Sequence, residues 1–165
     1  MNRKTVIVWD LDGTLRDGRH RLHLLPTGDY SNPDSWLPFN MACGGDSPIW
    51  DNIELLRSQA MAGYHIVLLT FCDDRAMQQT KEWLARHYIP YNRLIMRDID
   101  GGTDVDFKEQ RLRSIGVNNI LCMFDDSEHV VKHVRRMGIT CHQVTHYEES
   151  EKHAHLKSSE ELSHE

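Results

Sequence analysis

The fold of this chain is decided by the stretch Val6-Ile7-Val8-Trp9-Asp10-Leu11-Asp12-Gly13-Thr14-Leu15. An apolar run ends there in two carboxylates spaced two residues apart, and a Gly-Thr turn follows at once. Residues at this spacing on an extended strand point to the same face. If the run is a buried central strand, Asp10 and Asp12 leave its carboxyl end together, at the edge where open α/β sheets place their ligands.

Two carboxylates held a few ångströms apart repel each other, and a proton or a bound cation relieves the repulsion. Asp10 and Asp12 therefore fit a pair in which one carboxylate is ionised and the other can carry a proton. Gly13 permits the backbone conformation that a tight turn needs. The alternative is a strand followed by an acidic turn without a chemical role.

The composition fits one domain with one sizeable core, because 39% of the 165 residues are hydrophobic. A net charge of -6 argues against a protein that coats nucleic acid along a broad basic face. No stretch resembles a signal peptide and no apolar run approaches membrane-spanning length, so we expect a cytoplasmic setting and no membrane partner. The cysteines form no C-x-x-C pair, and Cys122 and Cys141 are predicted to be buried thiols.

Apolar, β-branched runs alternate with segments of helical periodicity along most of the chain. Strands are predicted at residues 5–9, 65–70, 94–96, 119–124 and 140–144. Helices are predicted from Ser47-Pro48 to Gly63, at residues 74–88, at 105–116, and from Ser127 to Gly138. This alternation predicts a Rossmann-like, three-layer α/β/α fold with a central parallel sheet and right-handed crossovers.

Two segments interrupt this alternation. Residues 16–46 lack a long period and combine proline and glycine with arginine and aromatic residues, which favours a folded flap inserted after the first strand over a linker. Residues 148–165 are polar and are predicted to be a disordered, solvated tail. We therefore expect one domain at residues 1–147, with the flap at 16–46, followed by the tail.

Polar side chains also stand at the ends of other predicted strands. Thr70 ends the second strand, Lys108 lies in the first turn of the third helix, and Asp125-Asp126 end the fourth strand. A lysine at that place needs a negative partner, because cations are disfavoured near a helix N-terminus. Each feature alone is commonly structural. Together they predict carboxylates, a hydroxyl and an ammonium group at one edge of the sheet.

In these residues the sequence resembles the haloacid-dehalogenase superfamily of phosphotransferases, whose four motifs are matched in order over roughly residues 5–145. Within that superfamily it is most similar to the phosphatase domain of phage polynucleotide kinases. The residues that carry the closer likeness are Arg19-His20-Arg21-Leu22-His23, Lys81-Glu82-Trp83-Leu84, Ile89-Pro90, Met96-Arg97, Asp104, Val130-Val131, Gly138, Cys141 and Gln143-Val144.

The resemblance implies a role for each matched residue. Asp10 would be the nucleophile that forms an aspartyl-phosphate, and Asp12 the general acid and then the general base. Thr70 would donate a hydrogen bond to a phosphoryl oxygen, and Lys108, oriented by Asp104, would neutralise charge. The resemblance also implies Mg2+, held by the Asp10 carboxylate, the backbone carbonyl of Asp12, and Asp125 or Asp126.

The sequence departs from the family pattern after the second strand. Polynucleotide-kinase phosphatases usually have Ser/Thr-Gly-Arg there, whereas this chain has Thr70-Phe71-Cys72. Arg75 is predicted to reach the site from the next helix in place of the missing guanidinium group. Gly102 and Thr103 stand where basic residues are usual, so we expect altered substrate recognition. No G-x-x-x-x-G-K-[ST] motif occurs, which argues against a 5′-kinase activity.

The expected substrate is a nucleotide or a 3′-phosphate end of a nucleic acid. Residues of the flap that could bind it are Arg16, Arg19, His20 and Arg21, with Tyr30 and Trp36 as stacking surfaces. Alternatively, the flap packs as a lid and its arginines face solvent. A nucleotidase acting on 5′ or 3′ phosphates, another small-molecule phosphatase, a phosphoacceptor signalling domain and a non-catalytic binding protein remain alternative functions.

Overall fold

Five parallel strands form the central sheet of the computed structural model, in the order β5-β4-β1-β6-β7. The structure describes residues 4–98 and 102–144. The strands of the sheet are β1 (Val6–Trp9), β4 (His65–Asp73), β5 (Arg93–Arg97), β6 (Ile120–Asp125) and β7 (Cys141–Gln143). Each lies on a predicted strand, so the predicted parallel sheet is confirmed.

Strand β1 lies at the centre of the sheet and pairs with β4 on one side and β6 on the other. Its last three residues, Ile7, Val8 and Trp9, are at most 2% exposed. A parallel strand that is covered on both faces requires such a continuous apolar run. The backbone N–H of Asp10 still donates to Phe124 O of the β6 strand. The two carboxylates of the opening motif therefore leave the sheet at its centre.

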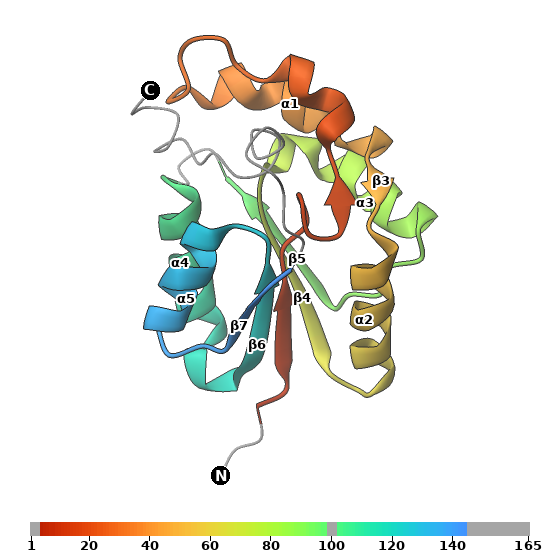
Figure 1. Ribbon diagram of the computed structural model, residues 1–165, viewed down its shortest axis with the longest axis vertical. Coiled ribbons are helices and arrows are strands. Elements are labelled where there is room, and N and C mark those ends of the chain that lie inside the picture. Colours follow the sequence, from red (N-terminus) through yellow and green to blue (C-terminus); the bar gives the residue numbers. More distant parts are fainter. Residues whose placement is uncertain (1–3, 99–101, 145–165) are drawn as a thin grey trace.

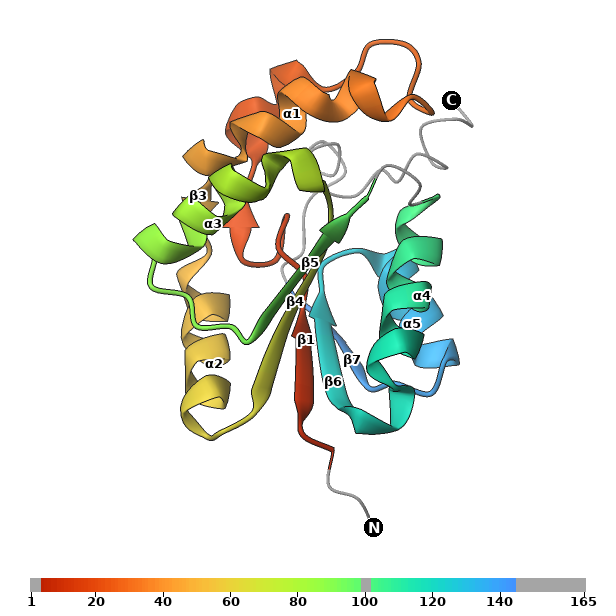
Figure 2. The ribbon, with the colours of Figure 1, turned by 180° about the vertical axis from the view of Figure 1, so that it is seen from behind.

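Helices cover both faces of the sheet, as Figures 1 and 2 show. The helices α2 (Trp50–Met61) and α3 (Met77–Arg86) pack on one face. The helices α4 (Asp104–Ile115) and α5 (Glu128–Arg136) pack on the other. Each face has its own buried apolar cluster, which includes Trp9 and Trp83 on the first face and Phe107 on the second. The predicted three-layer α/β/α fold is confirmed.

Two predicted element boundaries are wrong. Ser47-Pro48 do not cap the first helix: they form the short strand β3, which pairs with β2 (Arg16–Asp17), and α2 begins only at Trp50. Strand β4 does not stop at Thr70 but continues to Asp73, with a register shift between Thr70 and Asp73. In both cases pairing with a neighbouring strand overrides the local sequence signal.

The flap, residues 16–46, folds back over the carboxyl ends of the strands (Figure 1). It contains β2, the short helix α1 (Leu37–Met41), and the 3-10 turns η1 (Arg19–Leu24), η2 (Pro33–Trp36) and η3 (Ala42–Gly45). A small apolar cluster of Cys43, Cys72, Ala76 and Met96 joins it to the sheet. The predicted tail at 148–165 lies outside the described residues.

Among the residues that the structure describes, every helix is too short or too polar to cross a membrane. The cytoplasmic setting stays a prediction.

Helix α2 offers a matched test of the core. Leu56 is 0% exposed in the first cluster, whereas its neighbour Leu55 is 42% exposed. Leu56→Ala should lower the free energy of unfolding by about 2–5 kcal/mol, because it removes buried methyl groups and leaves a cavity. Leu55→Ala should change it by less than about 0.5 kcal/mol. Urea denaturation measures both values, and equal losses would contradict the described orientation of α2.

Candidate active site

Asp10 lies in a buried polar cluster directly beyond β1, with 4% of its surface exposed. Its Oδ1 accepts a hydrogen bond from Lys108 Nζ at 3.1 Å, and its Oδ2 accepts one from Thr14 Oγ1 at 3.2 Å. Thr14 is close because Gly13 takes a positive φ of 78°, and the turn folds back over the end of the strand. Asp10 is therefore held in one orientation through both of its oxygens.

Lys108 reaches this cluster from the second turn of α4. Its Nζ lies 2.8 Å from Asp125 Oδ2 and 3.2 Å from Asp104 Oδ1, in addition to Asp10. The side chain is 3% exposed. Burial alone would lower the pKa of Lys108, but the three carboxylates outweigh it and raise the pKa well above its ordinary value. Lys108 is thus a fixed positive charge, and Asp104 is placed to orient it.

Asp10, Asp125 and Asp126 form a group of carboxylates whose nearest oxygens all lie within 4.8 Å of one another. Burial raises the pKa of Asp10 and of Asp126, and the neighbouring carboxylates raise both further. Within the described part of the chain, Asp126 Oδ2 is buried without a hydrogen-bond partner. Buried carboxylate oxygens with an unmet need for positive charge are the ligands that Mg2+ prefers, so these residues fit a divalent cation.

Asp125 and Asp126 are not equivalent in this group. Both oxygens of Asp125 are engaged, one by Lys108 and the other by the backbone N–H of Ser127 at 2.9 Å. Asp126 uses only Oδ1, which accepts a hydrogen bond from Thr14 Oγ1 at 3.1 Å. Asp126 therefore has the free oxygen for a cation, whereas Asp125 mainly positions Lys108.

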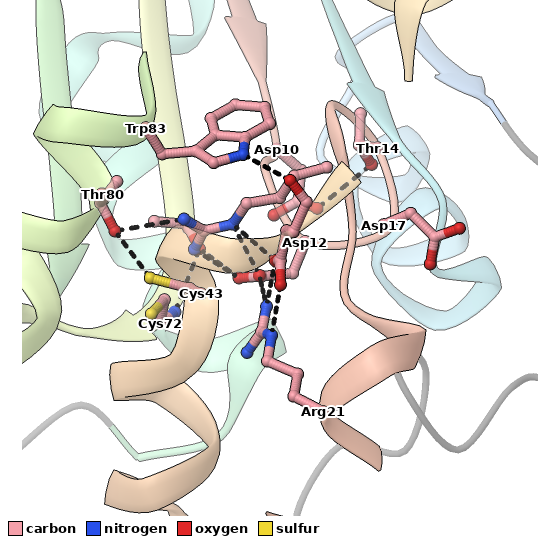
Figure 3. A network of polar contacts seen from close by, with 12 residues as sticks. Asp10, Asp12, Thr14, Asp17, Arg21, Cys43, Cys72, Thr80 and Trp83 are labelled. Carbon is pink, nitrogen blue, oxygen red and sulfur yellow. Dashed lines mark hydrogen bonds and ion pairs between the residues drawn. The ribbon is translucent and has the colours of Figure 1, made fainter. Parts of the chain in front are cut away.

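Asp12 has a different environment, although it lies only two residues from Asp10. Its Oδ1 accepts from Arg16 Nε at 2.9 Å and from an Arg21 terminal nitrogen at 2.5 Å, and its Oδ2 accepts from Thr70 Oγ1 at 3.2 Å (Figure 3). Burial would raise the pKa of Asp12, but the two guanidinium groups outweigh it and hold the pKa well below its usual range. Asp12 is therefore ionised in this conformation.

The two arginines are shared with a second carboxylate, that of Asp46 at the end of the flap. Arg21 donates to Asp46 from Nε at 2.9 Å and from a terminal nitrogen at 2.7 Å, and Arg16 Nε lies 3.5 Å from Asp46. The residues Arg16 and Arg21 are completely buried. Two positive and two negative groups balance each other in this network, which ties the flap to Asp12.

The remaining predicted residues lie around this centre. Arg19 is half-exposed and pairs with Asp17 at 2.5 Å, and the half-exposed His20 lies 2.8 Å from Asp46. Arg75, which is predicted to take the place of the missing guanidinium group, is engaged by two carboxylates. Its guanidinium is held by Asp73 and by Asp34 of the flap, each at 2.7 Å. Substrate binding by these residues stays a prediction.

The aromatic side chains of the flap pack against one another. Trp36 donates from Nε1 to Tyr30 O at 2.9 Å, and its ring meets the Phe39 ring edge-on, with 6.3 Å between centroids. The Phe39 ring lies under the Arg21 guanidinium, 4.1 Å from it. These contacts favour the interpretation of the flap as a packed lid. The expectation that its arginines face solvent is wrong for Arg16 and Arg21, which are completely buried, whereas Arg19 is half-exposed.

Asp46 and the structural role of Arg16 were not predicted from the sequence. Asp46 is a single acidic residue after two glycines, and no local pattern indicates its partners. Thr14 belongs to the recognised motif, but no local pattern indicates that its hydroxyl bridges Asp10 and Asp126.

Comparison with known proteins places this site in a family. Residues 4–148 match the model of the polynucleotide kinase PNKP phosphatase domain. A comparison with curated proteins gives no match.

Several solved structures have a similar fold. A chain of the Pnkp1/Rnl/Hen1 complex has a TM-score of 0.68 at 23% identity and is matched over 88% of this chain and 47% of its own length. A chain of the Pnkp1/Rnl/Hen1 RNA repair complex has a TM-score of 0.66 at 26% identity, over 84% and 42%. A predicted phosphatase from Clostridium acetobutylicum has a TM-score of 0.65 at 17% identity, over 98% and 97%.

The chain spans less than half the length of the two chains from the Pnkp1 complexes. The family match, in contrast, covers nearly all residues that the structure describes. The chain therefore belongs to the polynucleotide-kinase phosphatase-domain family of the haloacid-dehalogenase superfamily, and it is a phosphatase of that type.

Proposed function

We propose that the protein is a Mg2+-dependent phosphomonoesterase that acts through a phosphorylated Asp10 on nucleotides or on 3′-phosphate ends of nucleic acids. The observation that carries the proposal is the arrangement around Asp10. A carboxylate held by Lys108 and Thr14 lies in a buried acidic group that fits a divalent cation, and Asp12 stands beside it.

The nucleophile of the proposed reaction is the Asp10 carboxylate. It attacks phosphorus, a bond forms between the Asp10 oxygen and phosphorus, and the bond from phosphorus to the ester oxygen breaks. Lys108 holds the attacking carboxylate and offsets the negative charge of the phosphoryl group. Thr70, which is buried within β4, donates its hydroxyl to a phosphoryl oxygen once that hydroxyl leaves Asp12.

The cation would be held by Asp10, by Asp126 and by the backbone carbonyl of Asp12. When bound, Mg2+ neutralises negative charge on the phosphoryl oxygens and orients them for in-line displacement. The free Oδ2 of Asp126 supports this residue, and not Asp125, as the direct ligand.

Asp12 would act first as an acid and then as a base. In the second step, water attacks phosphorus, the bond from phosphorus to the Asp10 oxygen breaks, and phosphate leaves. The ionised form of Asp12 that Arg16 and Arg21 hold is the form that accepts the proton from this water. To protonate the leaving oxygen in the first step, Asp12 must carry a proton. Asp46 supports this exchange, because it can keep both guanidinium groups paired while their contact with Asp12 weakens.

Family membership supports a nucleotide or nucleic-acid end as the substrate. Two structural neighbours belong to complexes named for Pnkp1, Rnl and Hen1, one of them described as an RNA repair complex. We expect the half-exposed Arg19 and His20 of the flap, which pair with Asp17 and Asp46, to contact the sugar-phosphate chain next to the terminal phosphate.

Phosphate release from a substrate panel tests the function. With Mg2+ present, we expect release from a 3′-phosphorylated oligonucleotide and from 3′- and 5′-nucleoside monophosphates, because the residues around Asp10 are complete for phosphomonoester hydrolysis. Release from sugar phosphates alone would overturn the nucleotide assignment, and release from mononucleotides alone would favour a nucleotidase. The phosphoacceptor and binding-protein alternatives predict no turnover with any substrate.

The control for this panel is a pair of Asp→Asn substitutions. Asp10→Asn should lower turnover by a factor on the order of 10³ or more, because it removes the attacking carboxylate. Asp51→Asn, at an exposed position in the first turn of α2, should leave turnover unchanged. Activity that persists in Asp10→Asn would refute the nucleophile assignment.

Metal binding should be visible in thermal stability. The raised pKa values of Asp10 and Asp126 mean that the folded state holds their protons more tightly than the unfolded chain does. In chelator, stability should therefore fall as the pH rises from about 4, the unfolded value, through these raised values. Mg2+ at about 100 times its Kd should raise Tm by about 5–10 °C at neutral pH.

The same shift should shrink in acid, where the carboxyl groups are protonated and release the cation. Scanning calorimetry with Mg2+ and with chelator measures both effects. Asp126→Asn should remove the Mg2+ shift, whereas a shift of equal size at all pH values would exclude these carboxylates as the ligands.

The substitution Arg21→Lys tests whether Arg21 acts through the protonation of Asp12 or by binding the substrate directly. Lysine cannot reproduce the forked contact with Asp12 and Asp46, so kcat should fall on the order of 10²-fold. The acidic limb of the pH–rate profile should move to higher pH, because the pKa of Asp12 rises when the guanidinium contact that holds it down is weakened. Arg113→Lys, at an exposed position on α4, is the matched control. A rise in KM with unchanged kcat would instead assign Arg21 to substrate binding.

A further inference from the structure

Two buried cysteines meet where the flap contacts β4. Cys43 belongs to η3 of the flap, and Cys72 lies in β4 two residues after Thr70. They are 0% and 4% exposed, and both belong to the small buried cluster that joins the flap to the sheet. Figure 3 shows the two sulfur atoms next to each other, beside Thr80. The pair therefore spans the contact between the flap and the edge of the sheet.

The two thiols differ in reactivity. A hydrogen bond with the Cys72 thiol and the charge of the Arg16 guanidinium together lower the pKa of Cys43 to about 6, although burial opposes them. The same hydrogen bond and burial raise the pKa of Cys72. Burial raises the pKa of Cys122 and that of Cys141, the latter to about 12. Cys43 is thus the thiol of the four that most readily gives a thiolate, which is the nucleophilic form.

We propose that Cys43 and Cys72 are a redox-active dithiol whose disulfide locks the flap onto the catalytic edge and stops turnover. The effect on turnover rests on the proposed phosphatase function, whereas formation of the disulfide does not.

The oxidant would be a peroxide. The Cys43 thiolate attacks one oxygen of hydrogen peroxide, the O–O bond breaks, and hydroxide leaves, which gives a sulfenic acid at Cys43. The Cys72 sulfur then attacks the Cys43 sulfur, the S–O bond breaks, and the S–S bond forms. The two thiols lose two electrons and two protons in total, and the peroxide becomes two water molecules. A dithiol reductant reverses the reaction by exchange.

The position of the pair explains why a disulfide would act on the site. The backbone N–H of Cys72 donates to Thr70 Oγ1 at 3.1 Å, and Thr70 in turn contacts Asp12. The flap covers Asp12, whose side chain is only 21% exposed, so the substrate needs the flap to move. A covalent bond from Cys43 to Cys72 would prevent that movement.

The test begins with the reduced full-length protein, treated with hydrogen peroxide, alkylated and digested without reductant. We expect a peptide pair that joins Cys43 to Cys72, with the mass loss of two hydrogen atoms, and its disappearance after dithiothreitol. Proteolytic cleavage within the flap should slow on oxidation. Turnover of a phosphomonoester should fall about tenfold or more and return on reduction.

Matched variants assign these effects to the pair. Cys122→Ala/Cys141→Ala should keep the disulfide and the reversible loss of turnover. Cys43→Ser and Cys72→Ser should each abolish both, and their melting temperatures verify that they fold. Oxidation without a Cys43–Cys72 bond would overturn the proposal, as would a disulfide that changes neither cleavage of the flap nor turnover. If the reduced protein hydrolyses no phosphomonoester, the proposed function fails. Peptide mapping and proteolytic cleavage of the flap then still show whether the disulfide forms and whether it restrains the flap.

Discussion

One buried ammonium group faces three buried carboxylates and a fourth, partly buried one beyond the end of β1. Lys108 contacts Asp10, Asp104 and Asp125, and Asp126 lies in the same group. Charges removed from water are tolerated only when they are paired, and one positive charge does not balance four negative ones. The raised pKa values of Asp10, Asp104 and Asp126 express this imbalance. A divalent cation would correct it, so the same requirement governs both the stability of this edge and its chemistry.

On the flap side of the site, in contrast, the buried charges are balanced. Asp12 and Asp46 are matched by Arg16 and Arg21, and this network is neutral without any ligand. Two carboxylates that lie two residues apart in the sequence are therefore driven to different protonation behaviour by their surroundings. Different environments for two nearby carboxylates are how an enzyme assigns a nucleophile and an acid–base group at one pH.

The sheet and its catalytic edge could be predicted because they follow from local patterns. Apolar runs such as the one at β1 and glycine stops such as Gly63 fix the elements, and parallel strands bring Asp10, Thr70 and Asp125 to one edge. The flap could not be predicted in this way, because it has no periodicity. Its contacts, such as that of Asp46 with Arg21, depend on a chain reversal that no local signal encodes.

The sequence departs from the family pattern at Thr70-Phe71-Cys72, within β4. The chain reversal that forms the flap provides a structural counterpart to this departure. At the position where the family usually has an arginine, this chain has Cys72, and the nearby guanidinium group is that of Arg16. It lies close enough to Cys72 for each group to influence the pKa of the other, and it donates to Thr80 and Asp12. A guanidinium group that is already committed to Asp12 has fewer N–H groups left for a phosphate oxygen. The positive charge near Thr70 is therefore kept, but it acts on Asp12, the proposed acid–base group, more than on a substrate.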